Sequence, residues 1–175
     1  TIINADSMQI YNALKILTNR PDSFQLDKFT CKLFAKLELN KIASLGWWLE
    51  NAVHEIKKAF DEKRVPIVVG GTGMYLQAGL HGIAPVPDVP ANVHQHCIDL
   101  YRELGGAKFR DALAGYDADI AARLVDGDSQ RLVRAMGVAM ATDYPLSWWQ
   151  QQPHKGALLG SAVTILIMPP RPTLY

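Results

Sequence analysis

The fold is decided by the stretch Ile2-Ile3-Asn4-Ala5-Asp6-Ser7-Met8-Gln9-Ile10-Tyr11. Its first residues are apolar and predict a short strand, after which come a carboxylate, a hydroxyl and an amide. In an open parallel sheet the carboxyl ends of the strands line the ligand crevice. Asp6 is therefore the first candidate for a functional residue. Asp and Ser also begin turns by bonding their own backbone, so this stretch alone leaves both interpretations open.

A second strand with a polar end is predicted in Val65-Pro66-Ile67-Val68-Val69-Gly70-Gly71-Thr72-Gly73-Met74-Tyr75-Leu76. Its Val and Ile residues indicate a strand buried on both faces, as in parallel sheets, followed by a helix. The glycines permit positive φ and a close ligand approach, with amides and the Thr72 hydroxyl as donors. A tight turn without a ligand would look the same. The pattern is neither a Walker A sequence nor GxGxxG, so it does not specify a nucleotide.

An amphipathic helix is predicted between these strands, capped by Ser44 and running to about Arg64. Its apolar residues recur at helical spacing on one face and its charged residues lie on the other. The inward set is Leu49, Ala52, Val53, Ile56 and Phe60, and the outward set is Glu50, Glu55, Lys57, Lys58 and Lys63. Residues 12–28 read as a loop, and residues 29–45 define no element.

The second half begins with a proline-rich linker over residues 82–90, followed by short helices separated by Gly105-Gly106 and Gly115. Residues 88–128 carry eight acids against four bases. This excess of acids argues against a broad phosphate-binding face in this segment.

The remaining elements are a capped helix and an apolar run. Asp128 or Ser129 caps the helix, and Gln130 and Arg134 share a face of its first turns. Arginines in such a place can equally form a solvated face. The run over residues 162–168 predicts a last buried strand, which ends at Pro169-Pro170-Arg171.

Composition excludes several classes of protein. The chain has 175 residues, a formal net charge of +1 and 49% hydrophobic residues, so it is not a generally basic nucleic-acid binder. Cys31 and Cys97 have no metal-ligand or disulfide-framework spacing. No apolar run reaches the length of a membrane span and no signal peptide precedes Thr1. We expect a cytoplasmic protein.

Taken in order, these features closely resemble the bacterial tRNA dimethylallyltransferases, also called tRNA isopentenylpyrophosphate transferases. The segments that carry the resemblance are residues 6–11, 70–75, the proline-flanked helical insert, 130–135 and 169–171. It implies an α/β fold, with a P-loop NTPase-like parallel sheet core (residues 1–84 and 129–175) and a helical tRNA-binding insertion (residues 85–128). It also implies that the family's N-terminal phosphate loop and its C-terminal part are lacking here.

The resemblance implies transfer of a dimethylallyl group from dimethylallyl diphosphate to N6 of adenosine 37 beside the anticodon, with Mg²⁺ as cofactor. An exocyclic amine is a poor nucleophile, and Asp6 matches the general base that accepts its proton; Thr72 is the second catalytic candidate. The implied tRNA contacts are Asp6, Ser7, Met8, Gln9, Thr72, His94, Gln130, Arg131, Leu132, Val133 and Arg134. The implied diphosphate contacts are Gly71, Gly73 and Arg171, and no metal ligand is assigned.

The expected partners are the tRNA anticodon stem-loop and dimethylallyl diphosphate, with no membrane and a monomeric state. Two alternatives remain at this point. One is an adenylate isopentenyltransferase acting on free nucleotide, against which the helical insert argues. The other is a truncated, non-catalytic remnant that only binds RNA.

Overall fold

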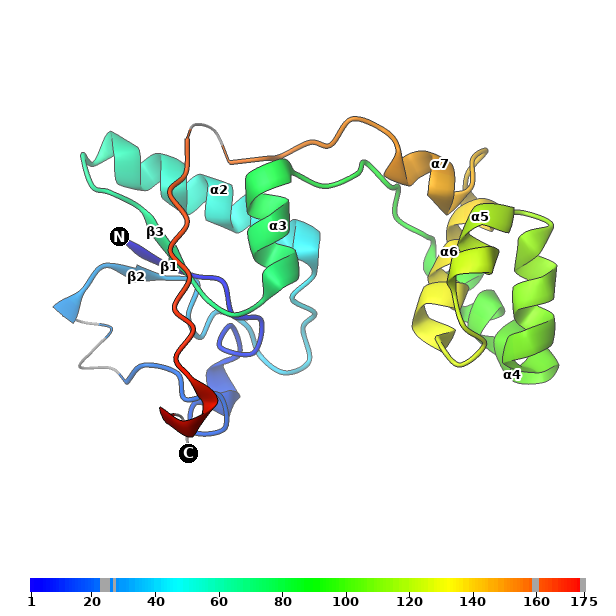
Figure 1. The fold of residues 1–175 in the computed structure, drawn as a ribbon, viewed down its shortest axis with the longest axis horizontal. Helices are drawn as coiled ribbons and strands as arrows, with labels where there is room; N and C mark the ends of the chain where they lie inside the picture. The colour runs from blue at the N-terminus through cyan, green and yellow to red at the C-terminus, as the bar shows by residue number, and fades with distance from the viewer. Residues whose placement is uncertain (23–25, 27, 159–160, 174–175) are drawn as a thin grey trace. The chain divides into compact units, whose positions relative to one another are not determined.

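The computed structural model describes residues 1–22, 26, 28–158 and 161–173, which form two compact units (Figure 1). The sheet unit comprises Thr1–Gly82 and Gly156–Tyr175, and the helical unit comprises Ile83–Lys155. The sequence placed the end of the helical part at residue 128. The unit continues to Lys155 because helix α6 (Ser129–Ala141) packs against helix α4 (Ala91–Ala114).

A three-stranded parallel sheet forms the centre of the sheet unit. Its order is β2 (Cys31–Lys32), β1 (Ile2–Asn4) and β3 (Ile67–Val69). Ile2 pairs with a residue of each neighbour, so β1 is the central strand. The predicted strand positions of β1 and β3 are confirmed. Strand β2 was not identified from the sequence, because two residues in a mixed apolar and basic segment carry no periodicity.

Two helices of the sheet unit pack on each other, α2 (Leu45–Asp61) and α3 (Gly73–His81). The predicted cap of α2 is confirmed, since Ser44 Oγ accepts a hydrogen bond from the Trp47 amide at 3.1 Å. Helix α2 also contacts β1. The predicted inward and outward faces of α2 are confirmed with two exceptions. Phe60, predicted to face inward, is 58% exposed. Glu55, predicted to face outward, lies 3.9 Å from the Lys32 ammonium group.

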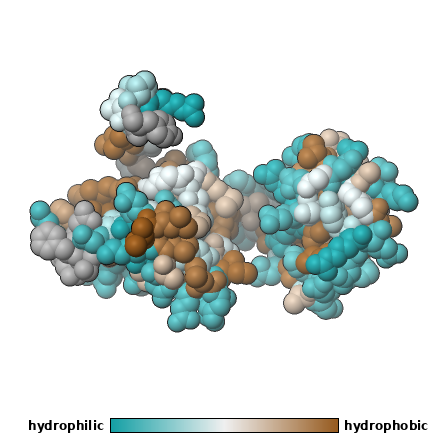
Figure 2. All heavy atoms as spheres, turned by 90° about the horizontal axis from the view of Figure 1, so that it is seen from below, coloured by the Kyte–Doolittle hydropathy of each residue, from teal (hydrophilic) through white to brown (hydrophobic). Residues whose placement is uncertain are grey.

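Two predictions of buried strands are wrong. The side chains of Ile67 and Val69 in β3 are about half exposed, because β3 is an edge strand in the described structure. Residues 162–168 form no strand, and Val163 and Ile167 are 91% and 86% exposed. Apolar composition predicts that a segment can be buried, but burial also needs a neighbouring strand to pair with. Hydrophobic side chains therefore reach the surface (Figure 2).

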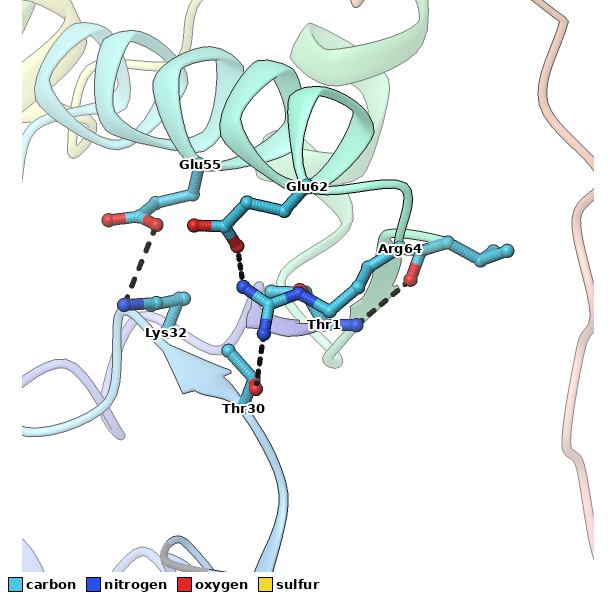
Figure 3. A network of polar contacts seen from close by, with 7 residues as sticks. Thr1, Thr30, Lys32, Glu55, Glu62 and Arg64 are labelled. Carbon is cyan, nitrogen blue, oxygen red and sulfur yellow. Dashed lines mark hydrogen bonds and ion pairs between the residues drawn. The ribbon is translucent and has the colours of Figure 1, made fainter.

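The amino ends of the strands are joined by a polar network (Figure 3). The Thr1 nitrogen donates to the Val65 carbonyl oxygen at 2.9 Å. The Arg64 guanidinium donates to Thr30 Oγ1 at 3.0 Å and pairs with the Glu62 carboxylate. Lys32, the last residue of β2, and Glu55 of α2 form a separate ion pair nearby. We call this edge of the sheet the amino edge.

The helical unit contains α4, α5 (Ala118–Arg123), α6 and α7 (Leu146–Gln150). The predicted break at Gly105-Gly106 is a kink inside α4, where Gly105 has φ 73°. The core of the unit contains Cys97, Phe109, Leu113, Leu132 and Met136, all with 0–1% exposure. The buried Asp117 carboxylate accepts from the amides of Ile120 and Ser147, which ties α5 to α7.

Short 3₁₀ turns complete the described elements, at Asn12–Leu14 and Arg171–Thr173. The first lies in the predicted loop over residues 12–28, of which 23–25 and 27 are outside the described residues. Both cysteines are free, as expected. None of the helices in the described part of the chain has the length and apolarity needed to cross a membrane.

Candidate functional site

The carboxyl ends of β1 and β3 bring together two turns that are far apart in the sequence. The Ser7 amide donates to Thr72 Oγ1 at 2.9 Å, and the Thr72 hydroxyl donates to Ser7 Oγ at 3.3 Å. The Thr72 amide also donates to the Ala5 carbonyl oxygen at 3.1 Å. We call this edge of the sheet, with its two turns, the carboxyl edge. The structure therefore brings Asp6, Ser7 and Thr72 to one edge of the sheet, where the carboxyl ends of parallel strands meet.

The Asp6 carboxylate is half-buried and only partly engaged. Its Oδ1 atom accepts a hydrogen bond from the Met8 amide at 2.9 Å, which closes a local turn. Among the described residues, Oδ2 makes no hydrogen bond. Asp6 is thus a turn residue and also presents a carboxylate oxygen that can accept a proton.

Asn4 is the residue that sequence reasoning missed at this edge. Its side chain is 1% exposed and makes three hydrogen bonds. Nδ2 donates to the carbonyl oxygens of Asp6 (2.9 Å) and Leu33 (3.1 Å), and Oδ1 accepts from the Asp6 amide (2.9 Å). The available signal was a single amide side chain inside an apolar strand, two residues before the candidate carboxylate.

Gly70 plays a different part from the one expected for the glycines of the second turn. A Cβ atom on Gly70 would lie 2.1 Å from the Ala5 carbonyl carbon, whereas Gly71 and Gly73 have open space. None of the three has positive φ. Glycine is needed at Gly70 because the ends of β1 and β3 approach each other closely. The open space at Gly71 and Gly73 leaves their backbone accessible to a ligand.

An aromatic pair supports the carboxyl edge from the helices. Trp48 and Tyr75 stack with ring centroids 4.6 Å apart, and Trp48 Nε1 donates to the Asn4 carbonyl oxygen at 2.7 Å. Tyr75 donates to the Ala43 carbonyl oxygen at 3.1 Å, while Tyr11 accepts from the Ala43 amide at 3.2 Å. Burial raises the pKa of the Tyr75 hydroxyl, and the nearby Tyr11 and Asp6 raise it further.

The other predicted residues of the sheet unit are less closely gathered. Met8 is 47% exposed, and Gln9 Nε2 donates to the Thr18 carbonyl oxygen at 3.0 Å. Arg171 lies in the second 3₁₀ turn and is exposed, with no ion pair among the described residues. No hydrogen bond joins Arg171 to Gly71 or Gly73 among the described residues.

The predicted residues of the helical unit fall into two groups. His94 and Gln130 line an open groove between α4 and α6, together with Tyr101 and Arg102. Arg131 pairs with Asp128 at 3.1 Å, and its side chain is 76% exposed.

The second group has structural contacts. Arg134 donates to the Pro87 carbonyl oxygen at 3.3 Å, which holds the proline-rich segment against α6. The side chains of Leu132 and Val133 are buried in the core of the helical unit. Leu132 can shape an RNA-binding face only by positioning α6, because its side chain is fully buried. Val133 is 5% exposed and also lines the groove.

The described residues offer no protein cage for a metal ion, since they contain no group of three or more His, Cys, Asp or Glu side chains that could hold one. The oxygen donors at the carboxyl edge are Asp6, Ser7 and Thr72. Mg²⁺ is commonly held by one or two carboxylates together with substrate phosphates. The residues present do not by themselves form a Mg²⁺ site.

Comparisons with known proteins place this arrangement in a family. The family model described as IPP transferase matches residues 9–175. The tRNA dimethylallyltransferase of Paramagnetospirillum magneticum is 38% identical over 174 residues, which cover 99% of this chain and 55% of the relative. The protein of the same name from Rhodospirillum centenum is 40% identical over 176 residues, covering 100% of this chain and 56% of the relative. The chain therefore spans about half the length of these relatives.

A solved structure shares the fold. It is a eukaryotic dimethylallyltransferase acting on tRNA, similar with a TM-score of 0.65 at 22% identity, over 78% of this chain and 34% of that one. Together with the parallel sheet and its helices, this likeness confirms the predicted α/β, P-loop NTPase-like fold.

Proposed function

This chain belongs to the IPP transferase family, and on that premise we propose that its carboxyl edge serves the transfer of a dimethylallyl group to tRNA. The donor is dimethylallyl diphosphate and the acceptor is N6 of adenosine 37, beside the anticodon. The observation that carries the proposal is the meeting of the Asp6-Ser7 turn and Thr72 at one edge of the sheet. Mg²⁺ is the proposed cofactor.

In the proposed reaction, the adenine amine attacks the allylic carbon of the donor. A nitrogen–carbon bond forms, the carbon–oxygen bond breaks, and the diphosphate leaves with the electrons of that bond. Asp6 Oδ2 accepts the proton that the amine loses, as a general base must. The Met8 amide holds Oδ1 at 2.9 Å and so orients the carboxylate.

The leaving diphosphate needs hydrogen-bond donors. The open backbone at Gly71 and Gly73 supplies accessible amides at the start of α3. The exposed guanidinium of Arg171 is the third proposed contact. These assignments follow the implied roles of the same residues in the family.

The proposed acceptor is a folded tRNA, bound also by the helical unit. A target base must leave its stack to reach a buried reaction centre, so the protein has to hold the surrounding RNA. The groove lined by His94, Tyr101, Arg102 and Gln130 carries cationic, amide and aromatic groups suited to this task. Arg131 is exposed beside it.

The test uses the protein encoded by the complete gene. Wild type is expected to prenylate an anticodon stem-loop with adenosines at positions 36, 37 and 38, and to leave AMP unmodified. Asp6→Ala should lower turnover to a small residual rate while RNA affinity changes little. Asp61→Ala, at the exposed end of α2, is the matched control and should retain activity.

Three results would contradict the proposal. Full turnover in Asp6→Ala would remove Asp6 from its role. Modification of AMP in preference to the stem-loop would identify an adenylate isopentenyltransferase instead. RNA binding without transfer in wild type would indicate the non-catalytic remnant.

A further inference from the structure

We propose that Asn4 is a positioning residue for the proposed general base, acting by fixing the backbone of Asp6 from both sides. The inference rests on the proposed function for the role of Asp6. It goes beyond that proposal because Asn4 is assigned no contact with either substrate. Asn4 is buried, so it can act on the reaction only through Asp6.

One side chain holds both polar groups of the Asp6 backbone. Asn4 Oδ1 accepts from the Asp6 amide and Asn4 Nδ2 donates to the Asp6 carbonyl oxygen, each at 2.9 Å. These two bonds restrain the backbone on either side of the Asp6 Cα atom. The direction of the Asp6 side chain follows, because the Cα–Cβ bond direction is set by the backbone.

The remaining Asn4 contacts anchor this clamp to the rest of the unit. The second Nδ2 proton goes to the Leu33 carbonyl oxygen at 3.1 Å, just after β2. The Asn4 carbonyl oxygen accepts from the buried indole of Trp48 at 2.7 Å. The side chain therefore uses two donors and one acceptor, all inside the protein.

Only an amide of this length satisfies all three partners. An aspartate offers acceptors alone and cannot donate to the two carbonyl oxygens. A serine hydroxyl is too short to reach residues on both sides. A leucine fills similar space but leaves a buried amide and two carbonyl groups without partners, which is costly.

A structural role alone would have different consequences from a positioning role. Loss of a merely structural contact lowers the amount of folded protein and leaves the chemistry of the folded fraction unchanged. Loss of a positioning contact lowers kcat in the folded fraction, because small displacements of a reacting group can cost about 100-fold in rate. The two roles separate in a measurement of kcat against KM on protein verified as folded.

The experiment compares Asn4→Ser and Asn4→Asp in the protein encoded by the complete gene, with the anticodon stem-loop as the RNA probe. Asn51→Ser is the matched control, because among the described residues its Nδ2 atom donates only to the Trp47 carbonyl oxygen of its own helix, at 2.8 Å. We expect kcat to fall about 10- to 100-fold in both Asn4 variants. KM for RNA should stay within about twofold, and the control should match wild type.

Hydrogen exchange provides an independent readout of the geometry. The Asp6 amide should lose protection in the Asn4 variants, while amides of the helical unit keep theirs. In an Asp6→Ala background, Asn4→Ser should leave the residual single-turnover rate unchanged, because the group it positions is absent.

Three results would overturn the inference: an unchanged kcat in folded Asn4→Ser, a further fall in rate when it is added to Asp6→Ala, or failure of both variants to fold. The last would mean that Asn4 determines stability and not the placement of Asp6. Failure of the proposed function is distinguishable, because Asp6→Ala alone would then retain turnover whatever the Asn4 variants do.

Discussion

The two edges of the sheet are held together in opposite ways. At the amino edge, exposed charged groups link the segments that precede the strands: Arg64 donates to Thr30 and pairs with Glu62, and the Arg64 and Glu62 side chains are about 40% exposed (Figure 3). At the carboxyl edge, neutral hydrogen bonds around the buried Asn4 side chain do so. Exposed ion pairs contribute about 0–1 kcal/mol and hold no single geometry. Buried neutral hydrogen bonds are directional and costly to break. The carboxyl edge is therefore the edge that can hold functional groups in a fixed geometry.

The largest expected effect comes from crowding the carboxyl edge. Gly70→Ala would place a methyl group 2.1 Å from the Ala5 backbone, so the strand ends must separate. We expect the free energy of unfolding to fall by about 3 kcal/mol. Gly71→Ala, with open space around it, should change it by less than about 0.5 kcal/mol. Urea unfolding followed at the Ile3 amide signal measures both, and equal effects would contradict the close approach.

The second prediction exchanges the same residue type at each edge. Thr72→Val removes the acceptor of the Ser7 amide and should lower the free energy of unfolding by about 1–2 kcal/mol. Thr30→Val removes an exposed contact with Arg64 and should cost less than about 0.5 kcal/mol. The same unfolding measurement applies. A larger loss of unfolding free energy in Thr30→Val than in Thr72→Val would mean that the amino edge, and not the carboxyl edge, is held in a fixed geometry.

The third prediction concerns alkaline pH. The pKa of Tyr75 is raised above its ordinary value of 10.0, first by burial. The folded state therefore retains the hydroxyl proton more strongly than the unfolded state, and stability should fall as pH rises above about 10. Tyr75→Phe should flatten this part of the profile relative to wild type. An identical slope in the variant would show that other groups cause the loss.

The smallest effect is expected at the ion pair of Lys32, beside the amino edge. Lys32→Met removes the ion pair with Glu55, whose atoms are 3.9 Å apart. Because this distance is long for an ion pair, we expect a change below about 0.5 kcal/mol. Salt at about 1 M should reduce the change only in part, since the two side chains are 28% and 18% exposed and partly buried charges are screened less. Thermal unfolding at low and high salt measures it. A loss of stability as large as that in Thr72→Val would mean that charged contacts in this region also hold a fixed geometry.

Local patterns were enough to predict several elements. The Ser44 cap and the spacing of Leu49, Ala52 and Ile56 predicted α2, and the apolar runs predicted β1 and β3. These signals depend only on residues that are close in the chain, so they can be recognised from the sequence alone. Residues 162–168 show the limit, because an apolar run does not reveal whether a partner strand lies beside it.

The candidate site was predictable only in part. Asp6 and Thr72 were identified as polar residues that follow strands, and the fold brings their turns together. Asn4 was not assigned a role, and Gly70 was expected to admit a ligand and not to meet a neighbouring strand. Each depends on a partner distant in sequence: Leu33 for the Asn4 amide and Ala5 for Gly70. Leu132 and Val133 were assigned to RNA contact, although their side chains lie in a core.

The sequence by itself determined the family, the α/β class and the chemical groups at the ends of two strands. Each of these can be recognised from short motifs that occur in a fixed order along the chain. Only the tertiary structure decided which glycine is sterically required and which amide holds Asp6. It also decided which edge of the sheet is held in a fixed geometry by buried hydrogen bonds. The physical reason is that close packing and buried hydrogen bonds are made between segments whose distance in space the sequence does not state.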